Sequence, residues 1–355
     1  MLERLLDILR CPECRGGLEM TTLESDGNEI FTGILHCPDK HFYPIYKGIP
    51  RMLPNSLSDY WPEIANSIPD PPPPVVSEIL SNKSFTAEGA AFDRPTMANF
   101  SNEWDNHDIG GRTWTMELND RVRWFFLEPI RIPKEDLKGK LLLDAGCGNG
   151  SQSVAYTEFG LEVVALDLST GLEKGHAFRN IHEKAKPEKV HFVQADLQKP
   201  PLAPESFDII HSAGVLHHTS DTHKSFLGLR PMLKPGGTFF IWLYKYEKIV
   251  TPIVNYMRAV TTRIPAPAFA KIADVMSVPF IGFCWSVNKL GIRQYQTPSR
   301  REAALAVHDI FGAPFAHYHD LEEVSEWYMS AGFEEVWGCN DGRRGFGACG
   351  RLPAE

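Results

Sequence analysis

The chain has 355 residues, of which 43% are hydrophobic, and its 36 Lys and Arg against 45 Asp and Glu give a formal charge of −9. This composition excludes an intrinsically disordered chain and argues against a protein that coats nucleic acid by charge alone. At roughly 100–200 residues per domain, the length predicts two or three folded units. Seven unevenly spread cysteines with no signal peptide before them fit a reducing compartment, so we expect a cytoplasmic protein.

No transmembrane segment is expected from the sequence. The first residues, MLERLLDILRC, carry acids and arginines and lack the apolar core of a secretory signal. The longest apolar run, residues 276–287, is shorter than the roughly 20 residues that a spanning helix requires. Association with a membrane surface stays open.

Three shifts in composition divide the chain. Residues 1–54 hold three of the seven cysteines and are predicted to form a small module. Residues 55–98 contain the run Pro71–Pro74 and are predicted to be an extended or polyproline-like linker. From residue 99 to residue 355, strand patterns alternate with helix patterns, which is typical of a doubly wound α/β sheet. A helical, apolar-rich insert at about residues 245–310 interrupts this alternation.

The N-terminal module contains four candidate zinc ligands. Cys11 and Cys14 form one pair, and Cys37 and His41 form a second pair after 22 intervening residues. Tetrahedral zinc binds thiolate and imidazole, and a two-residue gap allows one turn to present two sulfur atoms to the same ion. A module of about 50 residues buries little core, so a bound metal would stabilise it. Because protein ligands fill all four positions, we predict a structural zinc ion.

This module resembles the zinc ribbon at the head of some bacterial methyltransferases. In those ribbons the second ligand pair is followed by segments like residues 43–45 (YPI) and 48–50 (GIP). Their second pair is Cys-x-x-Cys, and here Lys40 occupies its last position. His41 replaces that ligand, an arrangement that resembles the zinc finger of large-subunit ribosomal RNA guanine methyltransferases.

A glycine-rich turn follows the first strand pattern of the α/β region. Residues 141–144 (LLLD) are predicted to form this strand, and a helix is predicted over residues 151–159. Glycines between a strand and a helix allow the backbone to turn sharply and to approach a ligand closely. Two acids follow later strand patterns: Asp167 is placed to accept ribose hydroxyls, and Asp196 is placed to bind an adenine amino group. Other elements are predicted at residues 163–167, 191–193, 207–211, 237–243 and 334–337 (strands) and 321–332 (helix).

Residues 138–243 resemble a class I S-adenosylmethionine-dependent methyltransferase of the type-11 subgroup. The resemblance rests on the D-x-G-x-G-x-G motif from Asp144 to Gly150, on both acids, and on the segments 212–218 (SAGVLHH) and 233–237 (LKPGG). It implies a Rossmann-like seven-stranded sheet with S-adenosylmethionine as the cofactor. The implied cofactor-binding residues are Asp144, Ala145, Gly146, Cys147, Gly148, Gly150, Asp167, Leu168, Asp196, Leu197, Ser212, Ala213 and Gly214.

The methyl group of a sulfonium is already activated for in-line displacement, so such an enzyme mainly aligns an acceptor and removes its proton. The candidate catalytic residues are His217, His218, His317 and His319, with Asp309 as a weaker candidate. Two structural alternatives stay open. The first is that His218 caps a helix or packs beneath the cofactor. The second is that the segment 315–320 is local packing and not a lid over the active site.

Two further segments are candidates for shaping the site. Residues 99–104, with Trp114, are predicted to form a flap over the cofactor, and the alternative is a core aromatic pair with a surface acid. Residues 245–304 hold nine Lys and Arg against three acids, so their charge is +6 while the remaining chain carries −15. Three interpretations of this segment stay open. It forms a cap over the acceptor pocket, or it forms a basic amphipathic surface for a lipid-linked or phosphorylated substrate. The third is a cap whose cations face solvent or the acidic core.

The sequence therefore predicts a methyltransferase that acts on a small or medium-sized metabolite, including sugars and lipid-linked intermediates. A ribosomal or transfer RNA base methyltransferase is the alternative that the His-containing zinc module suggests. The acidic net charge and the lack of an Asn/Asp-Pro-Pro-Tyr motif oppose it. A third alternative is a non-catalytic protein that binds S-adenosylmethionine. The oligomeric state is not predicted.

Overall fold

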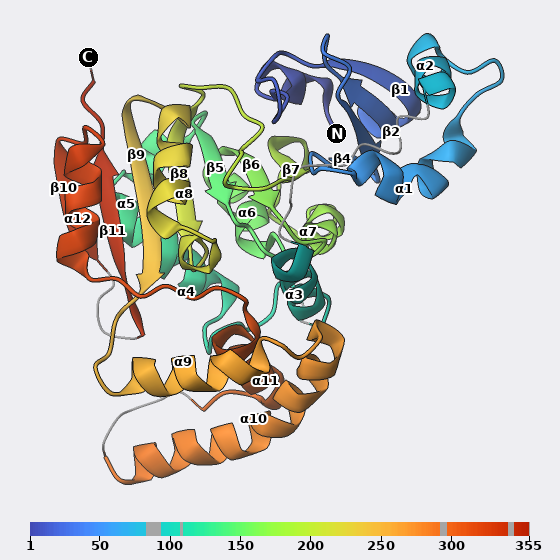
Figure 1. Cartoon of the computed structure of the whole chain (residues 1–355). Coiled ribbons are helices and arrows are strands. Elements are labelled where there is room, and N and C mark those ends of the chain that lie inside the picture. Colours follow the sequence, from blue (N-terminus) through green and yellow to red (C-terminus); the bar gives the residue numbers. More distant parts are fainter. Residues whose placement is uncertain (83–93, 107–108, 292–296, 340–343, 355) are drawn as a thin grey trace.

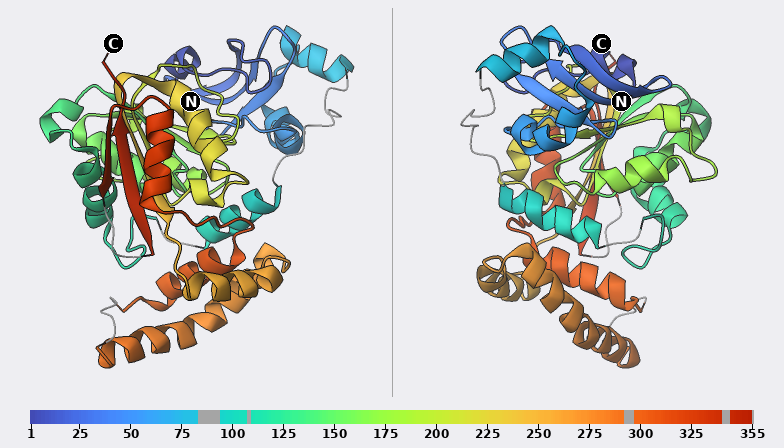
Figure 2. Two further views of the ribbon diagram at one scale, coloured as in Figure 1. Left: turned by 60° about the vertical axis from the view of Figure 1, so that its left-hand side comes forward. Right: turned by 90° about the vertical axis from the view of Figure 1, so that its right-hand side faces the viewer.

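The computed structural model describes residues 1–82, 94–106, 109–291, 297–339 and 344–354 (Figure 1). It contains an N-terminal module, a central mixed sheet covered by helices on both faces, and a helical cap. The N-terminal module and the cap lie at opposite ends of the sheet domain in all views (Figures 1 and 2).

The N-terminal module is a four-stranded antiparallel meander with two helices packed on it. Its strands are β1 (Glu19–Asp26), β2 (Glu29–His36), β3 (Phe42–Tyr46) and β4 (Ile49–Pro50). The helices α1 (Ser56–Ile64) and α2 (Pro74–Asn82) share a small apolar core with β2, formed by Ile34, Leu57, Ile64, Val76 and Ile79.

The predicted extended linker over residues 55–98 is therefore wrong for its described part, which is largely helical. The last proline of the run, Pro74, is the first residue of α2. A proline is tolerated there because the first turn of a helix has no partner for its backbone N–H. The apolar residues that follow at helical spacing pack against the ribbon.

The central sheet has seven strands in the order β10-β11-β9-β8-β5-β6-β7. Strands β5 (Leu141–Ala145), β6 (Glu162–Asp167), β7 (Val190–Gln194), β8 (Phe207–Ala213) and β9 (Leu233–Tyr244) are parallel, whereas β10 (Glu335–Cys339) and β11 (Gly345–Arg351) add an antiparallel hairpin. Ala145 pairs with Leu166, and Asp167 pairs with Gln194. The carboxyl ends of β5, β6 and β7 are therefore level, so the loops that follow them meet at one edge.

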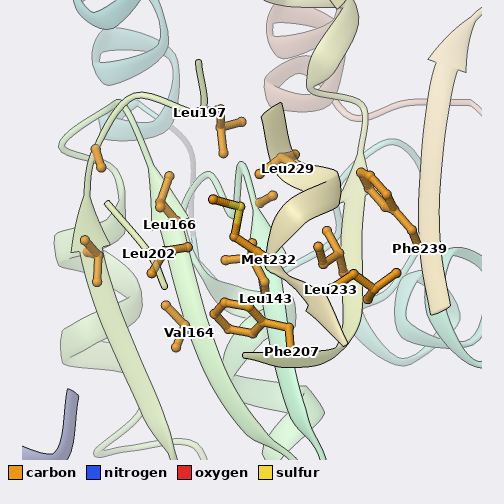
Figure 3. Packing of buried hydrophobic residues seen from close by; sticks show 14 of the residues in the cluster. Leu143, Val164, Leu166, Leu197, Leu202, Phe207, Leu229, Met232, Leu233 and Phe239 are labelled. Carbon is orange, nitrogen blue, oxygen red and sulfur yellow. The ribbon is translucent and has the colours of Figure 1, made fainter. Parts of the chain in front are cut away.

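Alternate residues of the parallel strands enter two different cores, as expected for a sheet that is covered on both faces. Leu142 packs under α4 (Leu118–Val122), α5 (Glu128–Ile130), α6 (Ser151–Tyr156) and α7 (Leu172–Phe178). Its neighbour Leu143 packs in the opposite core with residues of α8 (Thr222–Leu229) and α12 (Leu321–Ser330). Figure 3 shows that second core, in which Leu143, Val164 and Leu166 lie among Leu197, Leu202, Phe207, Leu229, Met232, Leu233 and Phe239.

Strand β11 was not predicted, because three of its seven residues are glycine, which is depleted in strands. The structure shows why glycine is needed there. A Cβ at Gly350 would lie 2.4 Å from Cδ1 of Tyr328, and a Cβ at Gly347 would lie 2.8 Å from Sγ of Cys339. Side chains of neighbouring elements fill the space in which side chains of these β11 residues would otherwise lie.

The N-terminal module docks on the free edge of the sheet beside β7. Arg51 forms a parallel bridge with Gln194, and the backbone N–H of Met52 donates to the carbonyl of Gln194 at 2.7 Å. The two apolar interiors merge, since Leu5 and Leu9 belong to the same core as Leu143. The module thus extends the sheet edge and closes one of its faces.

The cap consists of α9 (Val250–Thr261), α10 (Ala266–Lys289) and α11 (Arg300–Gly312), and α3 (Arg94–Asp105) lies between the cap and the sheet domain (Figure 1). By length and composition, α10 is long and apolar enough to cross a membrane, and 22% of its most apolar stretch is buried. The expectation from residues 276–287 missed this, because the apolar sequence continues to Ala266 with one lysine and one aspartate. A core helix can pass the same test when it is mostly buried, and this one is mostly exposed.

Candidate active site and zinc site

The four predicted zinc ligands converge in the N-terminal module. Their ligand atoms all lie within 4.8 Å of one another. Sγ of Cys14 is 3.6 Å from Sγ of Cys37, whose sulfur is 3.2 Å from Nδ1 of His41. Zn–S bonds of about 2.3 Å place neighbouring ligands at separations of this order, so the cluster fits one tetrahedral ion. Lys40 is exposed and pairs with Glu78 at 2.6 Å, away from the cluster.

The glycine-rich loop after β5 is packed so tightly that Gly146, Gly148 and Gly150 each exclude a side chain. Gly146 has a φ of +87°, and a Cβ there would lie 2.3 Å from Cγ1 of Val215. Gly148 has a φ of +57°, and its Cβ would lie 2.7 Å from the ring of Trp104. Such a loop presents backbone, not side chains, to whatever binds in front of it.

A cavity of about 700 Å³ opens in front of this loop, at the carboxyl ends of the parallel strands. Nine of the thirteen predicted cofactor-binding residues line it, namely Gly146, Cys147, Gly148, Asp167, Leu168, Asp196, Leu197, Ala213 and Gly214. The other four, which are Asp144, Ala145, Gly150 and Ser212, are not among the lining residues. Asp144 and Ala145 end β5, Ser212 lies on β8, and Gly150 directly precedes α6.

Asp144 anchors the start of the glycine-rich loop. It is buried and accepts hydrogen bonds from Oγ of Ser153 at 2.5 Å and from Nδ1 of His211 at 3.0 Å. Nε2 of His211 in turn lies 3.1 Å from the carbonyl of Phe125. The contacts of His211 with Asp144 and Phe125 therefore tie the loop to the cavity wall.

Asp167 faces the cavity from the end of β6. Burial raises its pKa, while hydrogen bonds from Oγ and N–H of Ser169 and from the N–H of Gly148 oppose that rise. Its Oδ2 lies 2.7 Å from the Gly148 nitrogen. One carboxylate therefore fixes the glycine-rich loop and lines the place where a ribose would bind. Asp196 lines the cavity just after the neighbouring strand β7 and accepts from the N–H of Gln198 at 2.8 Å.

The predicted flap residues also line the cavity. Phe100, Glu103 and Trp104 enter it from α3, and Trp114 enters from the following loop. The alternative with a surface acid is not what the structure shows, because Glu103 is only 4% exposed. Burial raises the pKa of Glu103, and its Oε2 lies 3.3 Å from Nδ1 of His308.

Of the four candidate catalytic histidines, His218 alone lines the cavity. Its Nδ1 donates to the carbonyl of Phe315 at 2.8 Å, and its Nε2 lies 3.3 Å from Oδ1 of Asp309. The hydroxyl of Tyr244 donates a short hydrogen bond to Oδ2 of Asp309. Burial by itself raises the pKa of Asp309, but His218 and the hydrogen bond from Tyr244 hold it below its usual value.

The other three histidines lie outside the cavity lining. His217 is fully buried and stacks on Tyr244 with ring centroids 3.9 Å apart, and burial holds its pKa well below the usual value. Nε2 of His317 lies 3.1 Å from the carbonyl of Thr219, and Nδ1 of His319 lies 3.1 Å from Glu323. The structure thus favours local packing for the segment 315–320 over an active-site lid.

Sequence reasoning missed most of the aromatic wall of the cavity. The missed aromatic residues are Trp124, Phe125, Trp242, Tyr244 and Phe280. A signal was present for two of them, since Trp242 and Tyr244 are two residues apart at the carboxyl end of the fifth parallel strand and share one face. The rule that pointed to the ends of the earlier strands applies equally to β9.

Comparison with known protein families agrees with this geometry. Residues 143–241 match the family model described as a methyltransferase domain, and residues 3–48 match the model described as Trm112p-like protein. Residues 143–241 therefore belong to a methyltransferase domain. The methyltransferase domain takes S-adenosylmethionine as its cofactor, and the N-terminal Trm112p-like zinc ribbon supplies the Cys3His metal site.

Individual relatives match parts of the chain. It is 31% identical over 147 residues to phosphoethanolamine N-methyltransferase 2 of Caenorhabditis elegans, which covers 40% of this chain and 33% of the relative. It is 30% identical over 157 residues to a ubiquinone biosynthesis O-methyltransferase of Coxiella burnetii, which covers 42% of this chain and 61% of the relative. The chain thus spans from one third to less than two thirds of these relatives' lengths.

Among solved structures, one similar to this chain is the complex between the Haloferax volcanii Trm112 methyltransferase activator and the putative methyltransferase. It aligns with 14% identity and a TM-score of 0.43, covering 74% of this chain and 100% of that one.

Proposed function

We propose that this chain transfers the methyl group of S-adenosylmethionine to an oxygen of a small or medium-sized acceptor with an aromatic or apolar body. The observation that carries the proposal is the position of the His218–Asp309 pair. Both residues line the same cavity as the glycine-rich loop and Asp167. A proton acceptor therefore shares one enclosed space with the cofactor-binding residues.

The residues present fit the cofactor. The loop from Gly146 to Gly148 offers backbone at close range, Asp167 is placed to accept the ribose hydroxyls, and Asp196 lies near the expected adenine. When bound, S-adenosylmethionine supplies an electrophilic methyl group that an aligned nucleophile displaces in line. What the chain must add is alignment and removal of a proton.

The His218–Asp309 pair is built to take up that proton. The carbonyl of Phe315 fixes the hydrogen of His218 on Nδ1, which leaves Nε2 as the basic nitrogen. Nε2 is buried and lies 3.3 Å from Oδ1 of the Asp309 carboxylate. An added proton there creates an imidazolium beside a carboxylate, and Tyr244 holds that carboxylate in place.

The cavity wall favours an apolar acceptor over a sugar or a nucleic acid. Most of its lining surface is apolar, and Phe100, Trp124, Phe125, Trp242 and Phe280 form broad aromatic surfaces. The similarity to a ubiquinone biosynthesis O-methyltransferase supports an acceptor of this kind.

The test uses the full chain with S-adenosylmethionine labelled in its methyl group. The labelled cofactor is incubated with three fractions of a cell extract, which are the lipid extract, the polar metabolites and the total RNA. We expect label in an extractable, amphiphilic product. Label in RNA or in a polar metabolite would contradict the acceptor class. Cofactor binding without transfer to any fraction would favour the non-catalytic alternative.

The matched variant is Asp309→Asn, which preserves shape and removes the charge beside His218. We expect transfer to fall by about 10²–10⁴-fold, the usual contribution of a positioned general base. Affinity for S-adenosylmethionine should stay within a few fold of the original, because Asp309 is not among the residues placed to bind the cofactor. Undiminished transfer would remove the pair from the mechanism.

A further inference from the structure

We propose that α9 and the outer face of α10 form a docking surface for an anionic lipid bilayer. The distribution of exposed apolar side chains is the first observation. Among described residues, eighteen large hydrophobic side chains are exposed, and thirteen of them lie between Tyr246 and Leu290. A soluble monomer rarely gathers exposed apolar groups in one segment without a partner for them.

The exposed apolar residues of α9 follow a helical spacing. Ile249, Ile253, Tyr256 and Val260 are 78%, 57%, 80% and 63% exposed, and they recur every three or four residues. The opposite side of the helix is fixed to the protein, because the guanidinium of Arg258 donates to the carbonyls at the end of α11, including that of Ile310 at 2.8 Å. The stripe therefore faces outward by construction.

Helix α10 has two apolar faces and only one of them is covered. Phe269, Ala273 and Cys284 are buried, and α10 packs along α11. On other sides of the same helix, Val275 is 69% exposed and Trp285 is 56% exposed. A helix that is apolar on every side is stable only where apolar groups surround it. The described part of the chain covers one side of α10 and leaves the other exposed.

The positive charge of this segment indicates which partner covers the surface. Residues 245–304 carry +6 while the remaining chain carries −15. Lys248, Arg263, Lys271 and Lys289 are exposed beside the apolar residues. An anionic bilayer matches this combination, because it attracts the cations and accepts the apolar stripe at its headgroup boundary. A second copy of this chain would bring the same exposed cations face to face, which disfavours a dimer through this face.

Two of the exposed aromatic residues, Tyr256 and Trp285, fit the same surroundings. Tyr256 and Trp285 each combine an apolar ring with a polar atom, and such rings concentrate at membrane–water interfaces. The ammonium of Lys289 lies 4.9 Å from the Trp285 ring centroid, so a cation and an aromatic ring are presented together.

The surface lies next to the active-site cavity and far from the zinc ribbon. Phe280 and Cys284 of α10 line the cavity, while the ribbon lies at the other end of the molecule (Figure 2). If the proposed function holds, docking would place the cavity one helix width from the source of an amphiphilic acceptor. The docking itself does not depend on that function.

A surface-bound helix fits the structure better than a membrane-spanning one, although α10 is long enough to span. Its inner face covers α11, which carries the buried His308 and Asp309. Withdrawal of α10 into a bilayer would expose those groups. The protein therefore meets the lipid with the outer face only.

The experiment is co-sedimentation of the full chain with vesicles. One set contains equal parts of phosphatidylglycerol and phosphatidylcholine, and the other contains phosphatidylcholine alone. We expect binding to the anionic set that weakens as salt is added. The variant Ile253→Glu/Val275→Glu should lower the partition coefficient at least tenfold, because two apolar side chains no longer enter the interface. The control is Ile181→Glu, which places one such charge on a residue that is 76% exposed outside the cap.

Thermal unfolding and S-adenosylmethionine binding check that each variant is folded. Absence of vesicle binding by the folded parent chain would overturn the proposal, as would equal losses in Ile181→Glu and the double variant. A concentration-dependent dimer that the double variant abolishes would assign the surface to a second copy. Binding that withstands both high salt and alkaline extraction would indicate a spanning helix. Vesicle binding is measured without methyl transfer, so failure here is distinct from failure of the proposed function.

Discussion

Arg51 of the zinc ribbon lies fully buried against Gln194, the last residue of β7, with its Nη1 3.1 Å from Oε1 of Gln194. The same Gln194 donates from Nε2 to the carbonyl of Leu168 at 3.0 Å, and Leu168 lines the cofactor cavity. A short chain of hydrogen bonds therefore connects the N-terminal module to the cofactor site. Glu173 completes the contact with an oxygen 2.7 Å from Nη2 of Arg51.

Replacing Arg51 should disturb both the interface and the cavity. In Arg51→Ala, Gln194 keeps its contact with Tyr60 and Glu173 keeps its pair with Lys47, but each loses the guanidinium. We therefore expect a loss of about 1–3 kcal/mol in unfolding free energy. Affinity for S-adenosylmethionine should also fall several fold, because Leu168 is held less firmly. Denaturant unfolding and calorimetry measure the two effects. A destabilised variant with unchanged affinity would show that the ribbon supports the fold without shaping the site.

Acid should loosen the second contact between ribbon and sheet domain. Burial raises the pKa of Glu29, but hydrogen bonds from His176 and Arg179 outweigh it and hold that pKa far below its usual value. An acid with a depressed pKa contributes stability above its unfolded-state pKa of about 4.3, and that contribution is lost as the pH falls toward the folded-state value. Unfolding temperatures measured from pH 7 to pH 3 should therefore drop steeply below about pH 4.

The variant Glu29→Gln should be less stable at pH 7, and its unfolding temperature should fall less steeply between pH 7 and pH 3 than that of the parent chain. The matched control is Glu78→Gln, which removes the exposed pair with Lys40 and should change stability by less than about 1 kcal/mol. Parallel pH profiles for the parent chain and Glu29→Gln would contradict the assigned role of this carboxylate.

The zinc site can be tested by exchanging ligands. Cys37→Ser should lose stoichiometric zinc and lower the unfolding temperature, since a structural zinc contributes directly to folding. His41→Cys restores the more usual four-cysteine set and should keep the metal. For both variants, elemental analysis measures the zinc content and thermal unfolding measures the stability. Full zinc occupancy in Cys37→Ser would show that the four residues are not the ligands.

Much of this architecture could be predicted because strand periodicity and the glycine loop are local signals. The first parallel strand is an apolar run, and the loop after it requires glycine at Gly146 and Gly148 because of positive φ and close neighbours. The two helices of residues 55–82 were missed because prolines and polar residues dominate that segment, while its few apolar residues find their partners in a distant strand.

The catalytic candidates show a second limit. In the sequence, the four histidines are equally suitable as a general base, because all carry the same imidazole group. Only the tertiary structure shows which of them reaches the cavity. His218 lines the cavity because it lies in the short turn after β8. His317 instead contacts the carbonyl of Thr219, and His319 contacts Glu323. Pairing of His218 with Asp309, which lies on the cap, joins segments about ninety residues apart and has no local signature.

The most direct test of the account is calorimetric titration of the full chain with S-adenosylmethionine. We predict one site per chain and, in Gly146→Ala, a loss of affinity of at least a hundredfold, because the new Cβ would lie 2.3 Å from Cγ1 of Val215 at a left-handed φ. Gly282→Ala, where a Cβ meets nothing within 4 Å, should bind like the parent chain. No binding by the parent chain, or undiminished binding by a folded Gly146→Ala, would contradict the assignment of the cavity to this cofactor.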